Sequence, residues 1–176
     1  MYEIEFRGKI DKQKYDQILN FLENNAKSLG EDNKDVVYYI FPDKLLKLVK
    51  NTSRNDAKVS LKMNKIGNGA SFEEIEFHLP IEQYDNTALL FSKLGLDCKK
   101  MEGPQKRMNY KYKNCEIAIK YSDEWGYHFE IEKMIENEDD QIEAEKEISE
   151  VAKELELPIM SDQELKDFIS NVESKL

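Results

Sequence analysis

The sequence predicts an α+β fold in one domain, in which eight or nine short strands are interrupted by two helices and followed by a helical tail. Three observations support this prediction. Charged and apolar residues alternate along several short segments, as they do in strands with two unlike faces. Two other segments repeat apolar residues at helical spacing, and residues 136–176 combine such spacing with a strongly acidic composition.

The sequence of the first half of the chain predicts five strands and two helices. Residues 2–9 alternate strictly between apolar and charged side chains. Asp11 is a suitable N-cap for a helix that continues to Gly30, and a second helix starts at Pro80 and ends near Gly95. The remaining strands are expected at 35–41, 44–51, 57–64 and 71–79, with a turn at 64–69.

The second half repeats this style and ends in helices. Strands are expected at about 97–102, 105–113, 115–121 and 127–135. An acidic helix then ends before Pro158, and Ser161 with Glu164 forms a capping box for a last helix. No linker interrupts the pattern, so we predict a single domain over residues 1–176. Its sheet occupies about 1–135 and its acidic helical tail about 136–176.

The distribution of charge excludes several classes of function. The formal net charge is −10, and the tail alone has 14 acidic and 4 basic residues, so the rest of the chain is neutral although densely charged. No basic stripe suggests nucleic-acid binding, and no apolar run is long enough to span a membrane. An acidic, strand-like start and only two cysteines, Cys98 and Cys115, favour a cytoplasmic protein without a signal peptide.

The strongest chemical signal is a repeated Glu-apolar-Glu pattern within predicted strands. It occurs at Glu3 and Glu5, and again in two later strands as Glu74-Ile75-Glu76 and Glu130-Ile131-Glu132. Residues two apart in a strand share a face, so each copy places two carboxylates side by side. Other strands offer polar and cationic side chains with the same alternation: Lys58, Ser60 and Lys62, and Arg107, Asn109 and Lys111.

Two arrangements explain this alternation. A half-exposed antiparallel sheet with water on one face has the same pattern. Clustered carboxylates repel, however, and are stabilised if cations or a divalent metal lie among them. A sheet closed into a barrel, with its apolar side outward under helices and its charged side inward, meets that requirement. Periodicity alone does not distinguish the closed barrel from the open sheet.

The order of these motifs resembles the CYTH superfamily of triphosphate tunnel proteins along nearly the whole chain. Glu3-x-Glu5-x-Arg7 is similar to the family's ExExK signature, with Arg7 in place of lysine. The segments LLKLVKN, VSLKMN and FEEIEF resemble the family's L-R-x-R, T-x-K and middle acidic strands, and Lys106-Arg107 falls where a basic pair is expected. WGYHFEIE resembles the closing strand, with Gly126, Glu130 and Glu132 in place.

This resemblance implies a closed or nearly closed antiparallel β-barrel of about eight strands that forms a tunnel. It implies hydrolysis of inorganic triphosphate or an organic triphosphate, with Mg²⁺ or Mn²⁺ as the cofactor. The implied metal ligands are Glu3, Glu5, Glu130 and Glu132, and catalysis would involve Glu3, Glu5 and Glu132. The implied phosphate-binding residues are Arg7, Lys47, Lys62 and Arg107, and Glu74 and Glu76 would complete the substrate site by orienting cations or a second metal.

Two departures from the family pattern leave alternatives open. Val49 stands where a second basic residue is usual, and Lys50 belongs to the opposite face of its strand. Lys120 stands where the family has an acidic residue, and Glu116 on the same face is a candidate to compensate. The alternatives to hydrolysis are therefore an adenylate cyclase that makes cyclic AMP from ATP, and a triphosphate-binding module with weakened catalysis.

Three further features have a structural reading. His128 shares the face of Glu130 and Glu132, and we expect it to pack or to line the lumen. Trp125, in the turn before the final strand, is expected at the rim of the barrel or in packing. The acidic tail is expected to be a solvated face over the barrel, with a homodimer contact as the alternative.

Overall fold

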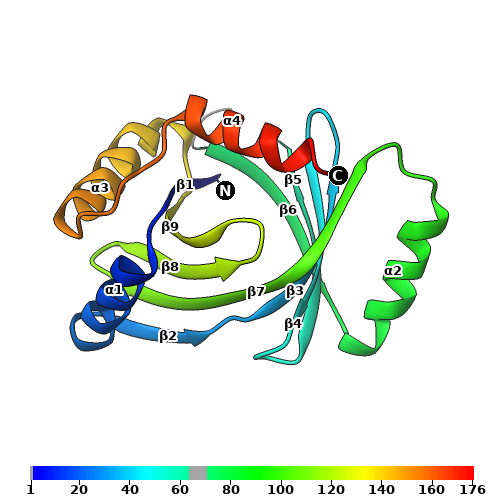
Figure 1. Cartoon of the computed structure of the whole chain (residues 1–176), viewed down its shortest axis with the longest axis horizontal. Helices are drawn as coiled ribbons and strands as arrows, with labels where there is room; N and C mark the ends of the chain where they lie inside the picture. The colour runs from blue at the N-terminus through cyan, green and yellow to red at the C-terminus, as the bar shows by residue number, and fades with distance from the viewer. Residues whose placement is uncertain (1, 64–70) are drawn as a thin grey trace.

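Eight antiparallel strands close into a barrel, and a ninth strand pairs with one of them (Figure 1). The protein was analysed as a computed structural model, which describes residues 2–63 and 71–176. The turn predicted at 64–69 and the end of the strand predicted at 57–64 lie outside the described residues.

The strands are β1 (Tyr2–Lys9), β2 (Lys27–Glu31), β3 (Lys34–Ile40), β4 (Leu45–Asn51), β5 (Asp56–Lys62), β6 (Ser71–Leu79), β7 (Lys99–Tyr112), β8 (Cys115–Ser122) and β9 (Gly126–Ile135). The closed barrel thus replaces the open sheet as the explanation of the alternating pattern.

Strand β7 closes the barrel because its two halves have different partners. Its first half pairs with β3 and its second half pairs with β8. The sequence predicted two strands here, at 97–102 and 105–113, and this prediction was wrong. Pro104 does not end the strand because β7 has only β3 as a neighbour at that point, so the missing N–H of proline need not interrupt a ladder.

Helix α1 (Lys12–Asn25) is shorter than predicted, and the strand β2 follows it. The predicted N-cap is confirmed, because the Asp11 carboxylate accepts a hydrogen bond of 2.7 Å from the backbone N–H of Lys14. The prediction that the helix continues to Gly30 was wrong, since residues 27–31 pair with β7 instead. The sequence KSLGE has little β-propensity of its own, and the pairing edge offered by β7 outweighs it.

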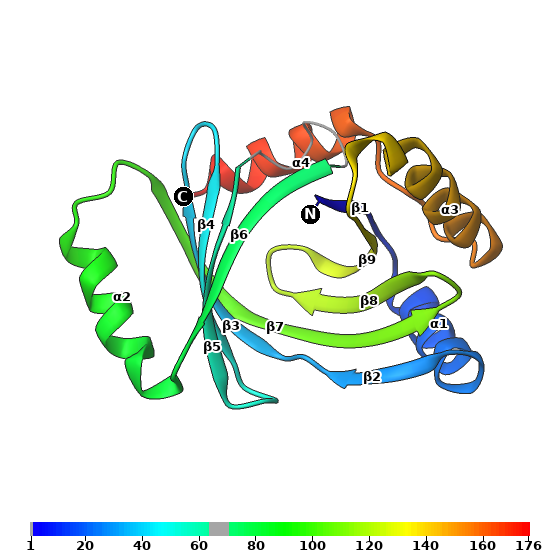
Figure 2. The same ribbon diagram turned by 180° about the vertical axis from the view of Figure 1, so that it is seen from behind.

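The apolar faces of most strands point outward under helices, as predicted, although Ile75 and Phe77 of β6 are 54% and 58% exposed. Ile4, Ile117 and Phe129 of the barrel wall pack under α1 and α3 (Gln141–Glu154), where Leu22 and Ile148 are fully buried. On the opposite flank, α2 (Tyr84–Lys93) covers a second apolar cluster on β3, β4 and β5 (Figure 2). A short 3₁₀ turn, Ile81–Gln83, precedes α2, and another, Glu138–Asp140, precedes α3. With its apolar faces turned outward, the barrel presents its charged faces to the lumen.

The tail does more than provide a solvated face. Helix α4 (Asp162–Glu173) begins at the predicted capping box of Ser161 and Glu164 and crosses one side of the barrel (Figure 1). The ring of Phe168 lies 4.5 Å from the ring of Trp125, centroid to centroid, and this contact gives Trp125 the packing role expected of it. None of the helices in the described residues is long and apolar enough to cross a membrane.

Candidate active site

The lumen of the barrel is a cavity of about 750 Å³ with a charged lining. All ten predicted site residues line it: Glu3, Glu5, Arg7, Lys47, Lys62, Glu74, Glu76, Arg107, Glu130 and Glu132. Counting every lining residue that the structure describes, nine are acidic and nine are lysine or arginine. The two signs of charge therefore meet in one cavity, and their formal charges cancel.

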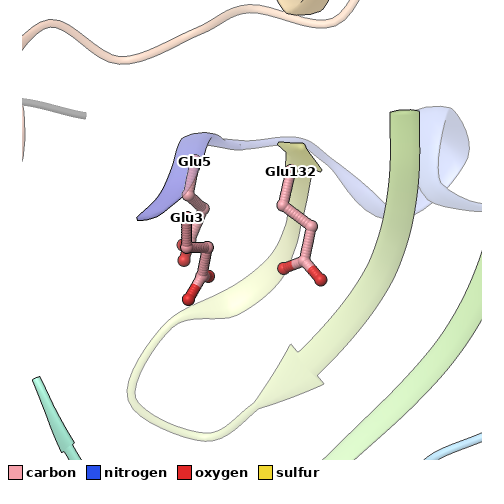
Figure 3. A group of neighbouring side chains, drawn as sticks. All are labelled: Glu3, Glu5 and Glu132. Atoms are coloured by element: carbon pink, nitrogen blue, oxygen red, sulfur yellow. The ribbon is translucent and has the colours of Figure 1, made fainter. Parts of the chain in front are cut away.

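Three carboxylates gather at one place in this cavity. Glu3 and Glu5 project from β1, and Glu132 projects from the neighbouring β9, where it lies directly opposite Glu5 (Figure 3). Each of the three offers an oxygen atom, and these oxygens lie within 4.8 Å of one another. An all-oxygen set of this kind suits a hard divalent cation such as Mg²⁺ or Mn²⁺.

Burial sets the charges of this carboxylate group. Burial and the neighbouring charge of Glu5 raise the pKa of Glu3 to about 10, although Lys62 opposes them. Burial also acts against ionisation of Glu5, but Arg7 and Lys62 outweigh it and lower the pKa of Glu5 to about 2. Burial likewise raises the pKa of Glu132. A divalent cation bound here would compete with protons for these oxygens.

Lysine side chains from two strands surround the carboxylate group. The ammonium of Lys62 lies 3.0 Å from the nearer oxygen of Glu5 and 3.9 Å from Glu74. Lys47 lies 3.5 Å from Glu74, whose carboxylate also accepts a hydrogen bond from Ser60. These contacts lower the pKa of Glu74 against the effect of its burial. Glu74 therefore holds the two lysines in place at the edge of the carboxylate group.

A second cluster is centred on Glu130. Its carboxylate contacts Lys120 at 2.7 Å, Arg107 at 3.3 Å and Arg7 at 3.7 Å. These three cations hold the pKa of Glu130 well below its usual range although the side chain is buried. The cations also oppose one another's protonation. Burial and then the charge of Arg107 lower the pKa of Lys120 to about 8, although the charge of Glu130 acts in the other direction.

The two departures from the family pattern have clear positions. Val49 lines the cavity, whereas the ammonium of Lys50 lies 5.7 Å from the ring centre of Tyr84 on the outer face, as predicted. Lys120 and Glu116, both on β8, line the cavity. Glu116 lies directly opposite Glu132 of β9, and its carboxylate is 4.0 Å from the guanidinium of Arg107. The compensation of Lys120 by Glu116 stays a prediction.

His128 lines the cavity in an uncharged form. One of its ring nitrogens lies 2.8 Å from the carbonyl oxygen of Gly126, and its ring packs 5.2 Å from the ring of Trp125. Burial and then the charge of Lys120 lower the pKa of His128 to about 3. The expectation that it packs or lines the lumen agrees with both observations.

Sequence reasoning missed a group of polar residues where β2 passes into β3. The buried carboxylate of Asp32 contacts Lys34 at 2.6 Å, the amide of Asn51 at 2.5 Å and Arg107 at 3.6 Å. The attraction of Lys34 and Arg107 lowers the pKa of Asp32 against the effect of burial. Asp32 lies between two strands, outside any alternating run, so no periodic signal identified it.

A closed antiparallel barrel with acids and bases facing one lumen defines the class of charged-tunnel proteins. The chain belongs to the CYTH domain family, whose pattern matches residues 1–164. The family includes triphosphatases and adenylate cyclases, so the class is enzymatic.

Solved structures support the assignment of the fold. The PH1012 protein from Pyrococcus horikoshii is 23% identical with a TM-score of 0.74, over 93% of this chain and 99% of that one. A proposed adenylate cyclase from Vibrio parahaemolyticus is 14% identical with a TM-score of 0.71, over 97% and 98%. A proposed adenylyl cyclase from Hippeastrum, described as having a dominant triphosphatase activity, is 14% identical with a TM-score of 0.63, over 90% and 89%. No curated protein matches the sequence significantly.

Proposed function

We propose that this protein hydrolyses a triphosphate in its barrel and depends on a divalent metal to do so. The observation that carries this proposal is the meeting of three carboxylate oxygens, within 4.8 Å of one another, with a set of lysines and arginines in one cavity. Carboxylates suit the metal and guanidinium or ammonium groups suit phosphate oxygens, so each half of the lining has a partner in a metal–triphosphate complex.

The balance of charge explains why a metal is needed. The lining residues that the structure describes sum to zero formal charge, and their acids and bases already pair with one another. A triphosphate adds several negative charges to this neutral space, which is costly in a buried site unless cations enter with it. A divalent cation that enters with the triphosphate offsets part of that charge.

Glu3, Glu5 and Glu132 would hold the metal, which when bound supplies Lewis-acid polarisation of a phosphoryl oxygen. Lys62 and Lys47 bind and orient phosphate oxygens beside this group. Glu74 and Glu76 hold the ammonium groups of neighbouring lysines toward the lumen. Arg7 and Arg107 stabilise the negative charge of the transferred phosphoryl group from the opposite cluster.

Glu130 has a different environment from the other three predicted ligands. Its contacts with Lys120, Arg7 and Arg107 support a role in orienting the two arginines. The sequence-based expectation that Glu130 also binds the metal stays a prediction. The same contact with Lys120 favours the second candidate, a binding module, because that ammonium adds positive charge beside a predicted ligand.

Phosphate release from tripolyphosphate, thiamine triphosphate and ATP, measured with and without Mg²⁺ or Mn²⁺, tests the proposal. We expect metal-dependent release from at least one of them and none from the Glu3→Ala/Glu5→Ala variant. Formation of cyclic AMP from ATP in the same assay would indicate the cyclase instead. Metal-dependent binding by calorimetry without turnover would indicate the binding module.

A further inference from the structure

Val49 is an apolar residue in the charged lining of the lumen. It projects from β4 into the cavity and lies directly opposite Val36 of β3, so two apolar side chains occupy adjacent lining positions. Its neighbour Lys50 cannot fill this gap, because Lys50 lies on the outer face over Tyr84. A phosphate beside Val49 therefore receives no contact from β4 at this level of the barrel.

The strand on the other side of Val49 offers a cation at the same level. Lys58 of β5 is the direct partner of Val49 in the β4–β5 ladder, and it lines the same cavity. Directly opposite residues of antiparallel strands have Cβ atoms about 5 Å apart. The long side chain of Lys58 can therefore reach the space beside the short side chain of Val49.

The ion pair that Lys58 makes is one that a ligand can displace. Its ammonium lies 2.5 Å from a carboxylate oxygen of Glu76, and the side chains are 25% and 37% exposed. Ion pairs with this degree of exposure contribute little to stability, so exchange of the carboxylate for a phosphate oxygen costs little. By contrast, Lys62 is 7% exposed and contacts carboxylates of Glu3 and Glu5.

Two further lysines lie within electrostatic reach of this position. Burial is the main cause that lowers the pKa of both Lys34 and Lys47. The positive charge of Lys58 lowers both values further, with a smaller effect than that of charges closer to each lysine. Lys34 projects from β3 and Lys47 from β4, and both line the cavity. Lysines from three adjacent strands thus line the cavity at ladder positions next to Val49: Lys58 is opposite it, Lys47 is two residues before it, and Lys34 is opposite Asn51, two residues after it.

We propose that Lys58 is a phosphate-binding residue that supplies, from the neighbouring strand, the positive charge that the side chain at position 49 lacks. This inference rests on the proposed triphosphate substrate. It assigns the bound phosphate chain to the wall formed by β3, β4 and β5, with Lys34 and Lys47 beside it.

Kinetics with tripolyphosphate and Mg²⁺ test the role of Lys58. Lys58→Met is expected to raise KM about 10- to 100-fold, the range for loss of one hydrogen bond to a charged group, with a smaller change in kcat. The Val49→Lys/Lys58→Val double variant places the lysine on β4 instead of β5, at the same level of the cavity. It is expected to reverse most of the rise in KM expected for Lys58→Met. A purely structural role of Lys58 predicts no such recovery.

Lys50→Met is the matched control, because it removes a lysine from the outer face of the adjacent strand and should leave KM unchanged. Melting temperatures of all variants identify any that fold poorly, and calorimetric affinity for tripolyphosphate provides a second readout. An unchanged KM and affinity in Lys58→Met, with an active wild type, would overturn the inference alone. A wild type that neither binds nor hydrolyses any triphosphate would overturn the proposed function itself.

Discussion

The ammonium of Lys62 lies 3.1 Å from both carboxylate oxygens of Glu3, although the two residues are 59 positions apart in the sequence. The same ammonium contacts Glu5 at 3.0 Å, so one buried lysine contacts the side chains of both residues. The nearby charges of Glu5 and Glu3 keep Lys62 protonated, since they raise its pKa although burial opposes them. Lys62 thereby connects the predicted metal-binding group to the predicted phosphate-binding side of the lumen.

Lys62→Met is expected to destabilise the protein by about 3–5 kcal/mol, because removal of one partner leaves buried charge uncompensated. Mn²⁺ is expected to raise the melting temperature of this variant more than that of the wild type, since the cation replaces the missing positive charge. Thermal unfolding with and without Mn²⁺ checks both statements. Lys12→Met, which removes an exposed pair with Asp16, is the control and should change stability by less than about 0.5 kcal/mol.

Glu132→Gln is expected to weaken Mn²⁺ binding about tenfold or more, because it removes one charge from the three-carboxylate group. Glu130→Gln is expected to change Mn²⁺ affinity less and to lower kcat, since it removes the charged partner that Arg7 and Arg107 share. Titration calorimetry and steady-state kinetics separate the two effects. Equal losses of Mn²⁺ affinity in both variants would show that Glu130 is a metal ligand.

Lys34 is expected to make stability depend on alkaline pH. Burial and the charge of Arg107 lower the pKa of Lys34 from 10.5 to about 8. Between these values the unfolded chain binds the proton more readily than the folded protein, so the contribution of Lys34 to stability rises with pH. The free energy of unfolding of wild type relative to Lys34→Met should therefore increase from about pH 7 to about pH 10. A constant or falling difference contradicts this prediction.

Phe168→Ala is expected to loosen helix α4 from the barrel. The variant removes the ring that packs on Trp125 and the cation–π contact with Lys9, whose ammonium lies 4.5 Å from the ring centre. Amide hydrogen exchange within residues 162–173 should accelerate while exchange in β1 and β9 stays unchanged. Asn171→Ala, on the exposed side of the same helix, is the control. Unaltered exchange in α4 would rule out Phe168 as its anchor.

The alternating sequence pattern was sufficient to predict which side chains share one face of a strand, whereas the enclosure of those faces in a lumen was implied only by the resemblance to the CYTH superfamily. Glu3, Glu5 and Arg7 share one face of β1 because side chains in a strand alternate, and the apolar residues between them require helices on the other face. The proximity of Glu5 and Glu132 could not be predicted in this way, because it depends on the register of β1 with β9.

The features that the sequence did not predict depend on tertiary structure. The strand β2 exists because β7 offers it an edge, and Asp32 is buried because three elements meet around it. Likewise, the apolar spacing of α4 predicted a helix but not its place, where the ring of Phe168 contacts the ring of Trp125. Local patterns specify periodicity, whereas these positions depend on contacts between distant segments.

The pairing of β1 with β9 has a consequence for biosynthesis. Tyr2 of β1 pairs with Ile135 of β9, so the edge of β1 that faces β9 stays unpaired until β9 has left the ribosome. Until then Glu3 and Glu5 lack Glu132, so the three-carboxylate group proposed to bind the metal is incomplete. A nascent chain is thus expected to remain inert toward nucleotides and polyphosphates during most of its translation.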